Sequence, residues 1–160
     1  MSPTSAMFII GTCNPRGEQN SYNGLYLTDK EIEDVVTKKK MQGIPVKSEH
    51  CGKDIGRVIS TFMNDKRELQ CLLEIDDQTI EGSVAGGFVW DNIAKDLSLG
   101  YVVDVKQTGT HLKAKEKQIL EVSLVRKGAR KGCHITMCEK DNRMFVRKPS
   151  CFEPFFDMSA

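Results

Sequence analysis

The chain has 160 residues, of which 39% are hydrophobic, enough for one compact core without disulfides or a metal. Its 23 basic residues nearly balance its 22 acidic ones, and clusters such as TKKK carry no interleaved aromatic residues, so nothing requires a nucleic-acid partner. No apolar run approaches the roughly 20 residues of a membrane helix, and the amino terminus does not resemble a signal peptide. We therefore expect one soluble domain over residues 1–160, without a membrane or nucleic-acid partner.

The cysteines indicate a reducing environment. They contain no CxxC pair and follow no metal-ligand spacing, and several fall inside predicted strands; they are Cys13, Cys51, Cys71, Cys133, Cys138 and Cys151. We expect reduced, mostly buried thiols inside a cell, and neither a metal nor a cofactor.

The first 40 residues predict two short strands and a helix. Apolar residues suggest strands over 7–11 and 25–27, separated by a loop rich in Gly, Pro and Asn. Thr28 and Glu31 have the spacing of a capping box, and apolar residues then recur at helical intervals. The lysine run 38–40 suits the negative end of that helix.

The middle of the chain predicts a hairpin and a second helix. Residues 44–62 suggest an extended piece, a glycine turn at 51–54 and a strand, with an antiparallel partner over 68–76 across the turn NDKR. Residues 82–95 favour a helix, although two adjacent glycines oppose it by roughly 1 kcal/mol each.

The remainder predicts strands over 97–105, 118–125 and 133–140, an edge strand over 144–148, and an irregular tail over 146–160. The whole pattern predicts an α+β fold that is mainly β, a small antiparallel β-barrel with one or two helices packed outside it.

One of these strands contains an unexpected acid. In QILEVSLV, Glu121 shares a face with Ile119, Ser123 and Val125, whereas the opposite face is wholly apolar. The simplest interpretation is a half-buried strand whose outer face is exposed to solvent.

A metal-free hydrolase of this size would need a nucleophile, a base and an orienting group. His111 lies in a polar loop, where a surface histidine is the default, and His134 lies in a strand, where a packed or half-exposed structural histidine is the default. His50 ends an extended segment beside a turn, where a side chain can face a cleft. Ser98, in LSLGY, is either a core-filling residue or a nucleophile, and Glu121 could orient a histidine that lies between them.

The segment RKGARKG follows the Glu121 strand. Its glycines, Gly128 and Gly132, surround Arg130, so the loop could direct backbone N–H groups and a guanidinium at a developing oxyanion. The alternative interpretation is a basic hairpin turn.

Taken in order, three blocks resemble the herpesvirus capsid maturation proteases, the assemblins, and the related prohead proteases of tailed phages. GIPVKSEHCGKDIGRVI resembles the block with the catalytic histidine, DLSLGYVV the nucleophile strand, and EVSLVRKGARKG the third block. The resemblance implies His50 as the base, Ser98 as the nucleophile and Glu121 as the orienting residue. Glu121 replaces the second histidine of the herpesvirus enzymes, as in the phage branch, and a carboxylate can stabilise the imidazolium.

The third block departs from the herpesvirus pattern once more. Two consecutive arginines are replaced by Ala129 and Arg130. The resemblance implies that the first position serves the oxyanion hole through its backbone N–H, which alanine retains, and that the second acts through its side chain. A helical region that builds the herpesvirus dimer interface has no counterpart in the 28 residues after Gly132, so a homodimer of that kind is doubtful.

The resemblance implies a serine endopeptidase that cleaves its own precursor and an internal viral scaffold protein at Ala-Ser-type bonds. It would act in the host nucleus or inside the assembling capsid. Ala160 would then be an autocleavage end, with an arbitrary end point as an equal alternative. Two rivals stay open: a non-enzymatic β-barrel module that binds capsid or scaffold, with a decayed or accidental triad, and a hydrolase that uses Cys51, although strand neighbours point to opposite faces.

Overall fold

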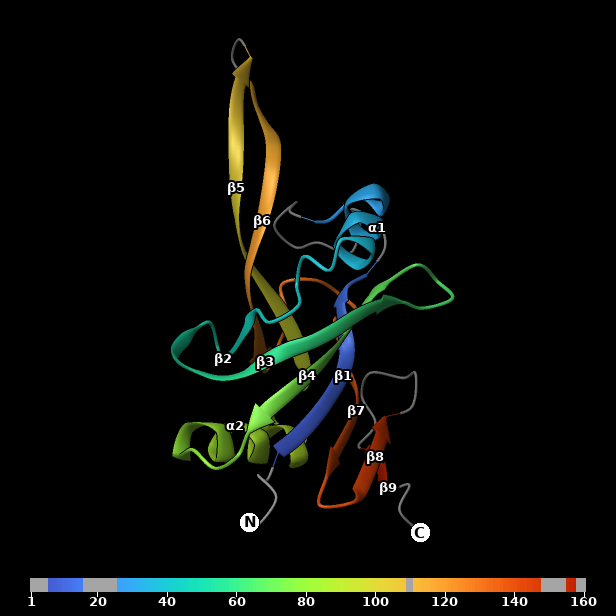
Figure 1. The fold of residues 1–160 in the computed structure, drawn as a ribbon, viewed down its shortest axis with the longest axis vertical. Coiled ribbons are helices and arrows are strands. Elements are labelled where there is room, and N and C mark those ends of the chain that lie inside the picture. Colours follow the sequence, from blue (N-terminus) through green and yellow to red (C-terminus); the bar gives the residue numbers. More distant parts are fainter. Residues whose placement is uncertain (1–5, 16–25, 109–110, 148–154, 158–160) are drawn as a thin grey trace.

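The computed structural model describes residues 6–15, 26–108, 111–147 and 155–157, with only the backbone for the strand residues within 104–116, for Arg147 and for 155–157. Figure 1 shows two helices beside a strongly twisted sheet. The elements are β1 (Ala6–Asn14), α1 (Asp29–Thr37), β2 (Pro45–Ser48), β3 (Cys51–Met63), β4 (Leu69–Asp76), α2 (Ile80–Trp90), β5 (Asp96–Thr108), β6 (His111–Val125), β7 (Ile135–Lys140), β8 (Arg143–Arg147) and β9 (Phe155–Asp157).

The strands form one sheet in the order β5-β6-β2-β3-β4-β1-β7-β8-β9. All neighbours pair antiparallel except β2 and β6, which are parallel, with Val46 opposite Val122. The sheet does not close into a continuous ladder. Instead it curls until Asp96, at the start of β5, forms an isolated bridge with His134, just before β7. The prediction of a mainly β fold with one or two helices is confirmed, whereas the described strands neither close into a barrel nor pair in a purely antiparallel way.

Both helices begin at threonine caps. Thr28 and Glu31 form the predicted capping box ahead of α1, and Ile32 and Val35 are the buried residues of that helix. Thr79 caps α2, so the helix starts earlier than the expected residue 82. It also ends earlier than expected, because Asn92, just beyond its end, adopts a positive φ of 61°. Neither helix in the described part of the chain is long and apolar enough to cross a membrane.

A long β5–β6 hairpin projects from the body of the molecule (Figure 1). Its pairing runs from Asp96 opposite Val125 to Thr108 opposite His111, so the expected polar loop around His111 is in fact strand. The register shifts between Gly100 and Tyr101, where Leu120 is the extra residue on β6. This bulge lies directly beside Glu121.

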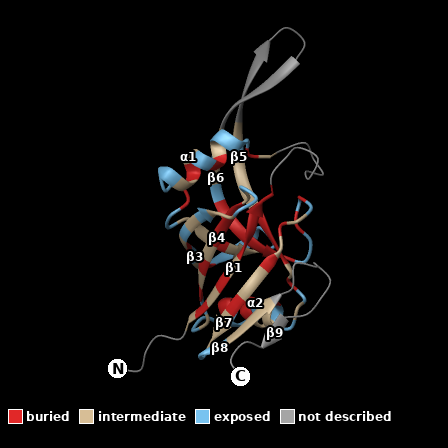
Figure 2. Cartoon of the chain, turned by 90° about the vertical axis from the view of Figure 1, so that its right-hand side faces the viewer, coloured by how far each residue is buried: buried red, intermediate tan, exposed pale blue. Residues whose placement is uncertain are grey.

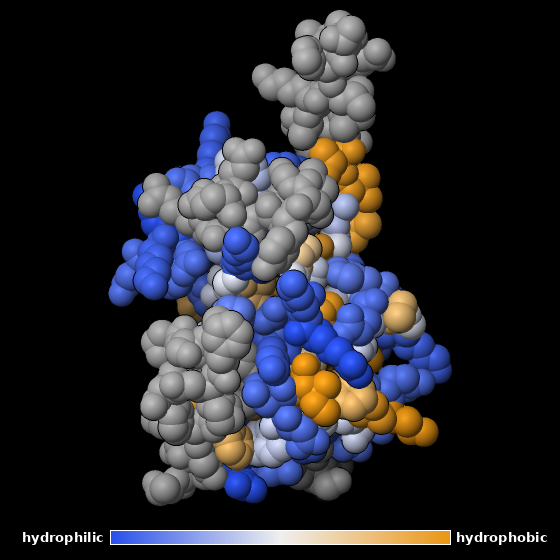
Figure 3. Space-filling view, turned by 180° about the vertical axis from the view of Figure 1, so that it is seen from behind, coloured by the Kyte–Doolittle hydropathy of each residue, from blue (hydrophilic) through white to orange (hydrophobic). Residues whose placement is uncertain are grey.

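The core lies along the middle of the sheet, where buried residues of β1, β4 and β6 gather (Figure 2). Its largest fully buried side chains include Met7, Ile9, Leu73, Leu97 and Leu124. Figure 3 shows apolar side chains also gathered at the surface near the base of the hairpin. Val102 and Leu120 are the exposed apolar residues of β5 and β6.

Three other expectations are wrong. Of the strand expected over 25–27, the described residues Tyr26 and Leu27 are irregular, and Leu27 N–H bonds to the Asn14 side chain, while residue 25 lies outside the described residues. Strand β8 is not an edge, because it pairs with β7 on one side and β9 on the other. Strand β9 itself lies in the tail that was expected to be irregular, while Ala160 lies outside the described residues.

Candidate active site

The tight turn between β2 and β3 carries His50. Glu49 and His50 both have positive φ, 50° and 60°. Positive φ at both central residues is what a two-residue hairpin turn of type I′ requires. The turn therefore falls at Glu49 and His50 rather than at the expected position 51–54. Positive φ is costly for residues other than glycine, and such strain concentrates at functional sites.

Two hydrogen bonds fasten this turn to the end of β6. Glu49 N–H donates to the carbonyl of Leu124 at 3.1 Å, and His50 N–H donates to Ser123 Oγ at 3.0 Å. The imidazole is consequently held over the strand that carries Glu121. Its side chain is 42% exposed, so one side of the ring remains accessible from solvent.

The structure brings His50, Ser98 and Glu121 together. His50 Nε2 lies 2.9 Å from Ser98 Oγ, and His50 Nδ1 is hydrogen-bonded to Glu121 Oε1. An ionised carboxylate can only accept, so the proton of a neutral imidazole belongs on Nδ1, and Nε2 is left to accept from the serine hydroxyl. This is the arrangement that a general base needs in order to activate a hydroxyl nucleophile.

The register of β5 against β6 explains why the carboxylate and the serine lie so close. Ser98 is opposite Ser123, and Gly100 is opposite Glu121. A Cβ on Gly100 would lie 2.4 Å from Glu121 Oε1 and 2.7 Å from its Cγ, so the glycine leaves the space that the acidic side chain occupies. Glu121 is only 8% exposed, which excludes the wet outer face suggested by the sequence.

Ser123 connects two members of this group. Its hydroxyl accepts the N–H of His50 and donates to Glu121 Oε2 at 2.8 Å, and the residue is completely buried. A buried carboxylate is stabilised in its charged form by donors of this kind. The sequence pattern shows Ser123 only as a neighbour of Glu121 on the same face of the strand.

A cavity of about 230 Å³ opens beside Ser98. Ser98, Ala129 and Arg130 all line it, so the two expected oxyanion residues lie on the same hollow as the serine. Gly128 N–H, in the same loop, donates to Asp96 Oδ2 at 2.8 Å. Backbone amides that point into a hollow beside a serine can stabilise a tetrahedral oxyanion.

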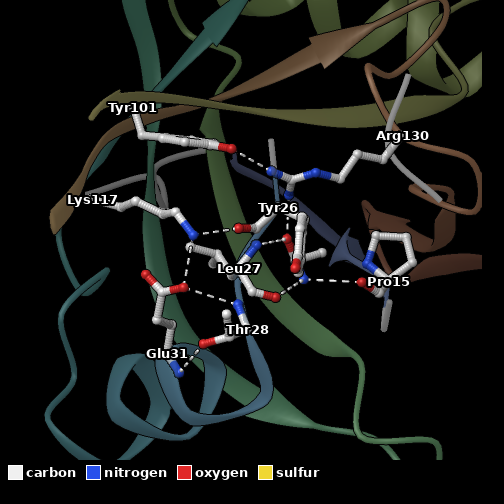
Figure 4. Close-up of polar contacts among 9 residues, drawn as sticks. Pro15, Tyr26, Leu27, Thr28, Glu31, Tyr101, Lys117 and Arg130 are labelled. Carbon is white, nitrogen blue, oxygen red and sulfur yellow. Dashed lines mark hydrogen bonds and ion pairs between the residues drawn. The ribbon is translucent and has the colours of Figure 1, made fainter. Parts of the chain in front are cut away.

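The side chain of Arg130 has a different environment from the one expected. It is buried, its Nη1 donates to Asn14 Oδ1, and its Nη2 donates to the hydroxyl of Tyr101 at 2.6 Å (Figure 4). Burial raises the pKa of Tyr101, and the Arg130 charge opposes that shift without cancelling it. The guanidinium thus anchors the loop to β1 and β5, a structural role that the sequence did not suggest.

Asn14 extends this anchor to α1. Its Oδ1 also accepts the N–H of Leu27 at 3.1 Å, next to the capping box of α1 (Figure 4). Within that box, Glu31 Oε1 also accepts from Lys117 Nζ at 2.8 Å. Burial alone would raise the pKa of the Glu31 carboxyl, but the bonds from Lys117 and Thr28 and the Lys117 charge together lower it.

The other candidates lie outside this group. Cys51 is exposed, and its thiol faces the carbonyl of Ser48 at 3.6 Å, while both nitrogens of the neighbouring imidazole are engaged by Ser98 and Glu121. His134 is half-buried against Asp96, with Nδ1 2.7 Å from Oδ1, in keeping with a structural histidine.

Four of the five described cysteines are buried, as expected: Cys13, Cys71, Cys133 and Cys138. Burial raises the pKa of the Cys13 and Cys133 thiols, which therefore stay protonated. Within the described ranges, no group of three or more His, Cys, Asp or Glu side chains is placed to hold a metal.

The fold is that of a herpesvirus protease. The crystal structure of the KSHV protease, solved in complex with a hexapeptide phosphonate inhibitor, matches with a TM-score of 0.54 and 17% sequence identity over 86% of this chain. The present chain spans 66% of the length of that protein. No protein-family model matches the sequence, and no curated protein matches it. At this identity the likeness concerns the fold, and the roles of individual residues rest on the geometry described above.

Proposed function

We propose that this protein is a serine endopeptidase of the capsid-maturation type. The observation that carries the proposal is the position of His50, which bonds Ser98 Oγ through Nε2 and the buried Glu121 carboxylate through Nδ1. The protease-like fold and the cavity beside Ser98 support it.

In the proposed reaction, Ser98 Oγ attacks the carbonyl carbon of the peptide bond while its proton passes to His50 Nε2. The Glu121 carboxylate stabilises the resulting imidazolium, and the amides of Ala129 and Arg130 hold the oxyanion. His50 then gives the proton to the leaving amine, and the C–N bond breaks to leave an ester on Ser98. Water, activated by His50, hydrolyses that ester and restores the serine.

The proposed substrates are an internal viral scaffold protein and the enzyme's own precursor, cleaved at Ala-Ser-type bonds, and the proposed setting is the interior of an assembling capsid in the host nucleus. These proposals are supported by the three sequence blocks and by the fold of the KSHV protease.

A fluorophosphonate probe and a peptide with an Ala-Ser bond test the proposal together. Wild-type protein should be labelled at Ser98 and should cleave the peptide slowly, as followed by mass spectrometry, whereas Ser98→Ala should do neither. Ser60→Ala is the matched control, because Ser60 is an exposed serine on β3. Equal labelling of wild type and Ser98→Ala would remove Ser98 as the nucleophile. A folded wild type that reacts with neither reagent would favour the non-enzymatic module.

A further inference from the structure

The loop over residues 126–132 is fastened on both sides of Ala129 by side chains from other strands. On one side, Gly128 N–H donates to Asp96 Oδ2 at 2.8 Å. On the other side, the Arg130 guanidinium donates to Asn14 Oδ1. Both acceptor residues are buried, at 8% and 0% exposure respectively. The two amides assigned to the oxyanion thus lie in a short segment whose flanks are fixed.

Asp96 is itself held in place relative to Ser98. It stands two residues earlier in β5, and its second carboxylate oxygen, Oδ1, lies 2.7 Å from His134 Nδ1. The backbone on either side is also tied down, because Leu97 N–H donates to the carbonyl of Cys133 at 2.8 Å and Ile135 N–H donates to that of Lys95 at 2.9 Å. Ser98 and the Asp96 carboxylate therefore lie on one stretch of β5 that several hydrogen bonds hold against the segment before β7.

Gly128 packs directly on that strand. A Cβ at this position would lie 2.9 Å from the carbonyl oxygen of Leu97 and 3.2 Å from the Cβ of Cys133. This close approach brings Gly128 N–H within hydrogen-bonding distance of the Asp96 carboxylate, to which it donates. A charge-assisted bond of this kind is short and stronger than a neutral one, so it is well suited to fix a loop.

We infer that Asp96 is a positioning residue for the oxyanion loop: it fixes Gly128, and through it the amides of Ala129 and Arg130, at the distance from Ser98 that the tetrahedral intermediate requires. The inference rests on the proposed function. It explains how an oxyanion hole can be preformed within one chain, so that little reorganisation is needed at the moment of reaction.

Kinetics of three variants test the inference. Asp96→Ala should lower kcat by about 10-fold to 100-fold and leave KM within about twofold, because the loop matters to the transition state rather than to peptide binding. Asp96→Asn should recover most of kcat. Its Oδ1 can still accept from Gly128, and its amide can donate to His134 Nδ1 in the other tautomer. Asp76→Ala is the control, since Asp76 Oδ1 also accepts a backbone N–H, that of Gln78 at 3.0 Å, in the connection between β4 and α2.

Amide hydrogen exchange gives a readout that needs no activity. In wild-type protein the Gly128 amide should be protected and its proton shifted downfield, and in folded Asp96→Ala both features should be lost. A wild-type Gly128 amide that exchanges as fast as an unprotected one would overturn the inference even if no variant folds. So would an active wild type whose kcat is unchanged in Asp96→Ala. A wild type that is inactive, yet has a protected Gly128 amide that Asp96→Ala exposes, would refute the proposed function while leaving Asp96 as the residue that holds the loop.

Discussion

Replacing Glu121 by glutamine tests the candidate triad most sharply, because the change keeps the size of the side chain and removes only its charge and one acceptor. Ser123 determines how the amide of the new glutamine side chain is oriented. Its oxygen accepts the N–H of His50, and its single proton is donated to Glu121 Oε2, so in the variant the amide oxygen should face Ser123 and the NH₂ group should face His50 Nδ1. The imidazole proton must then move to Nε2, which can no longer accept from Ser98.

The opposite amide orientation would preserve the tautomer, but it would leave the buried Ser123 proton without its acceptor, at a cost of about 1–3 kcal/mol. Loss of the carboxylate charge also removes stabilisation of the imidazolium. Together these effects should lower kcat by about 10⁴-fold, or about 5.4 kcal/mol in activation free energy at 1.36 kcal/mol per tenfold.

The assay is steady-state cleavage of the Ala-Ser peptide, with the thermal midpoint of unfolding measured in parallel. Glu74→Gln is the matched control, since Glu74 is paired with Arg57 at 3.5 Å in the β3–β4 ladder. If Glu121→Gln keeps more than about a tenth of wild-type kcat/KM, Glu121 does not fix the histidine tautomer and the reasoning fails.

Three further predictions follow from the same geometry. Ser123→Ala should lower kcat about 10-fold to 100-fold in the peptide assay, because the His50 N–H and one carboxylate oxygen lose their partner, and a change confined to KM would contradict this role. Glu31→Gln keeps the capping box but loses the ion pair with Lys117. Chemical denaturation at pH 7 should therefore show that the free energy of unfolding falls by at most about 1 kcal/mol, because the pair is partly exposed. Since the folded-state pKa of Glu31 is lowered, this stabilisation is present above the ordinary value of 4.5 and disappears as the pH falls through the folded pKa; a difference that grows on acidification would refute it. Iodoacetamide should alkylate the exposed Cys51 without loss of peptidase activity, whereas inactivation that matches Cys51 modification would revive the thiol hypothesis.

Much of the local structure was readable from the sequence because it depends on neighbouring residues. The capping box at Thr28 and Glu31 and the β3–β4 hairpin are examples. The turn was expected at 51–54 because that segment contains a glycine, whereas the pairing of Ser48 with Cys51 places the turn at Glu49 and His50.

The partners of buried polar groups could not be predicted in this way. Asp96 and Asn14 carry no signal in the sequence, because each bonds to a residue far along the chain: Asp96 to Gly128 and His134, and Asn14 to Arg130. A sequence signal for Asp96 or Asn14 would have to show that the polar side chain is buried. The alternation of apolar and polar residues along a strand does not show this.

The sequence by itself determined a mainly β chain and, through three ordered blocks, the residues from which a triad could be built. Only the tertiary structure decided that Ser98, His50 and Glu121 meet, because this depends on the register of β5 against β6 and on the parallel pairing of β2 with β6. The first depends on the bulge at Leu120 within the hairpin, and the second joins segments distant in sequence. The tertiary structure also reversed the simplest interpretation of Glu121: an acid on the polar face of a strand is buried here, because the curled sheet and the β2–β3 turn cover that face.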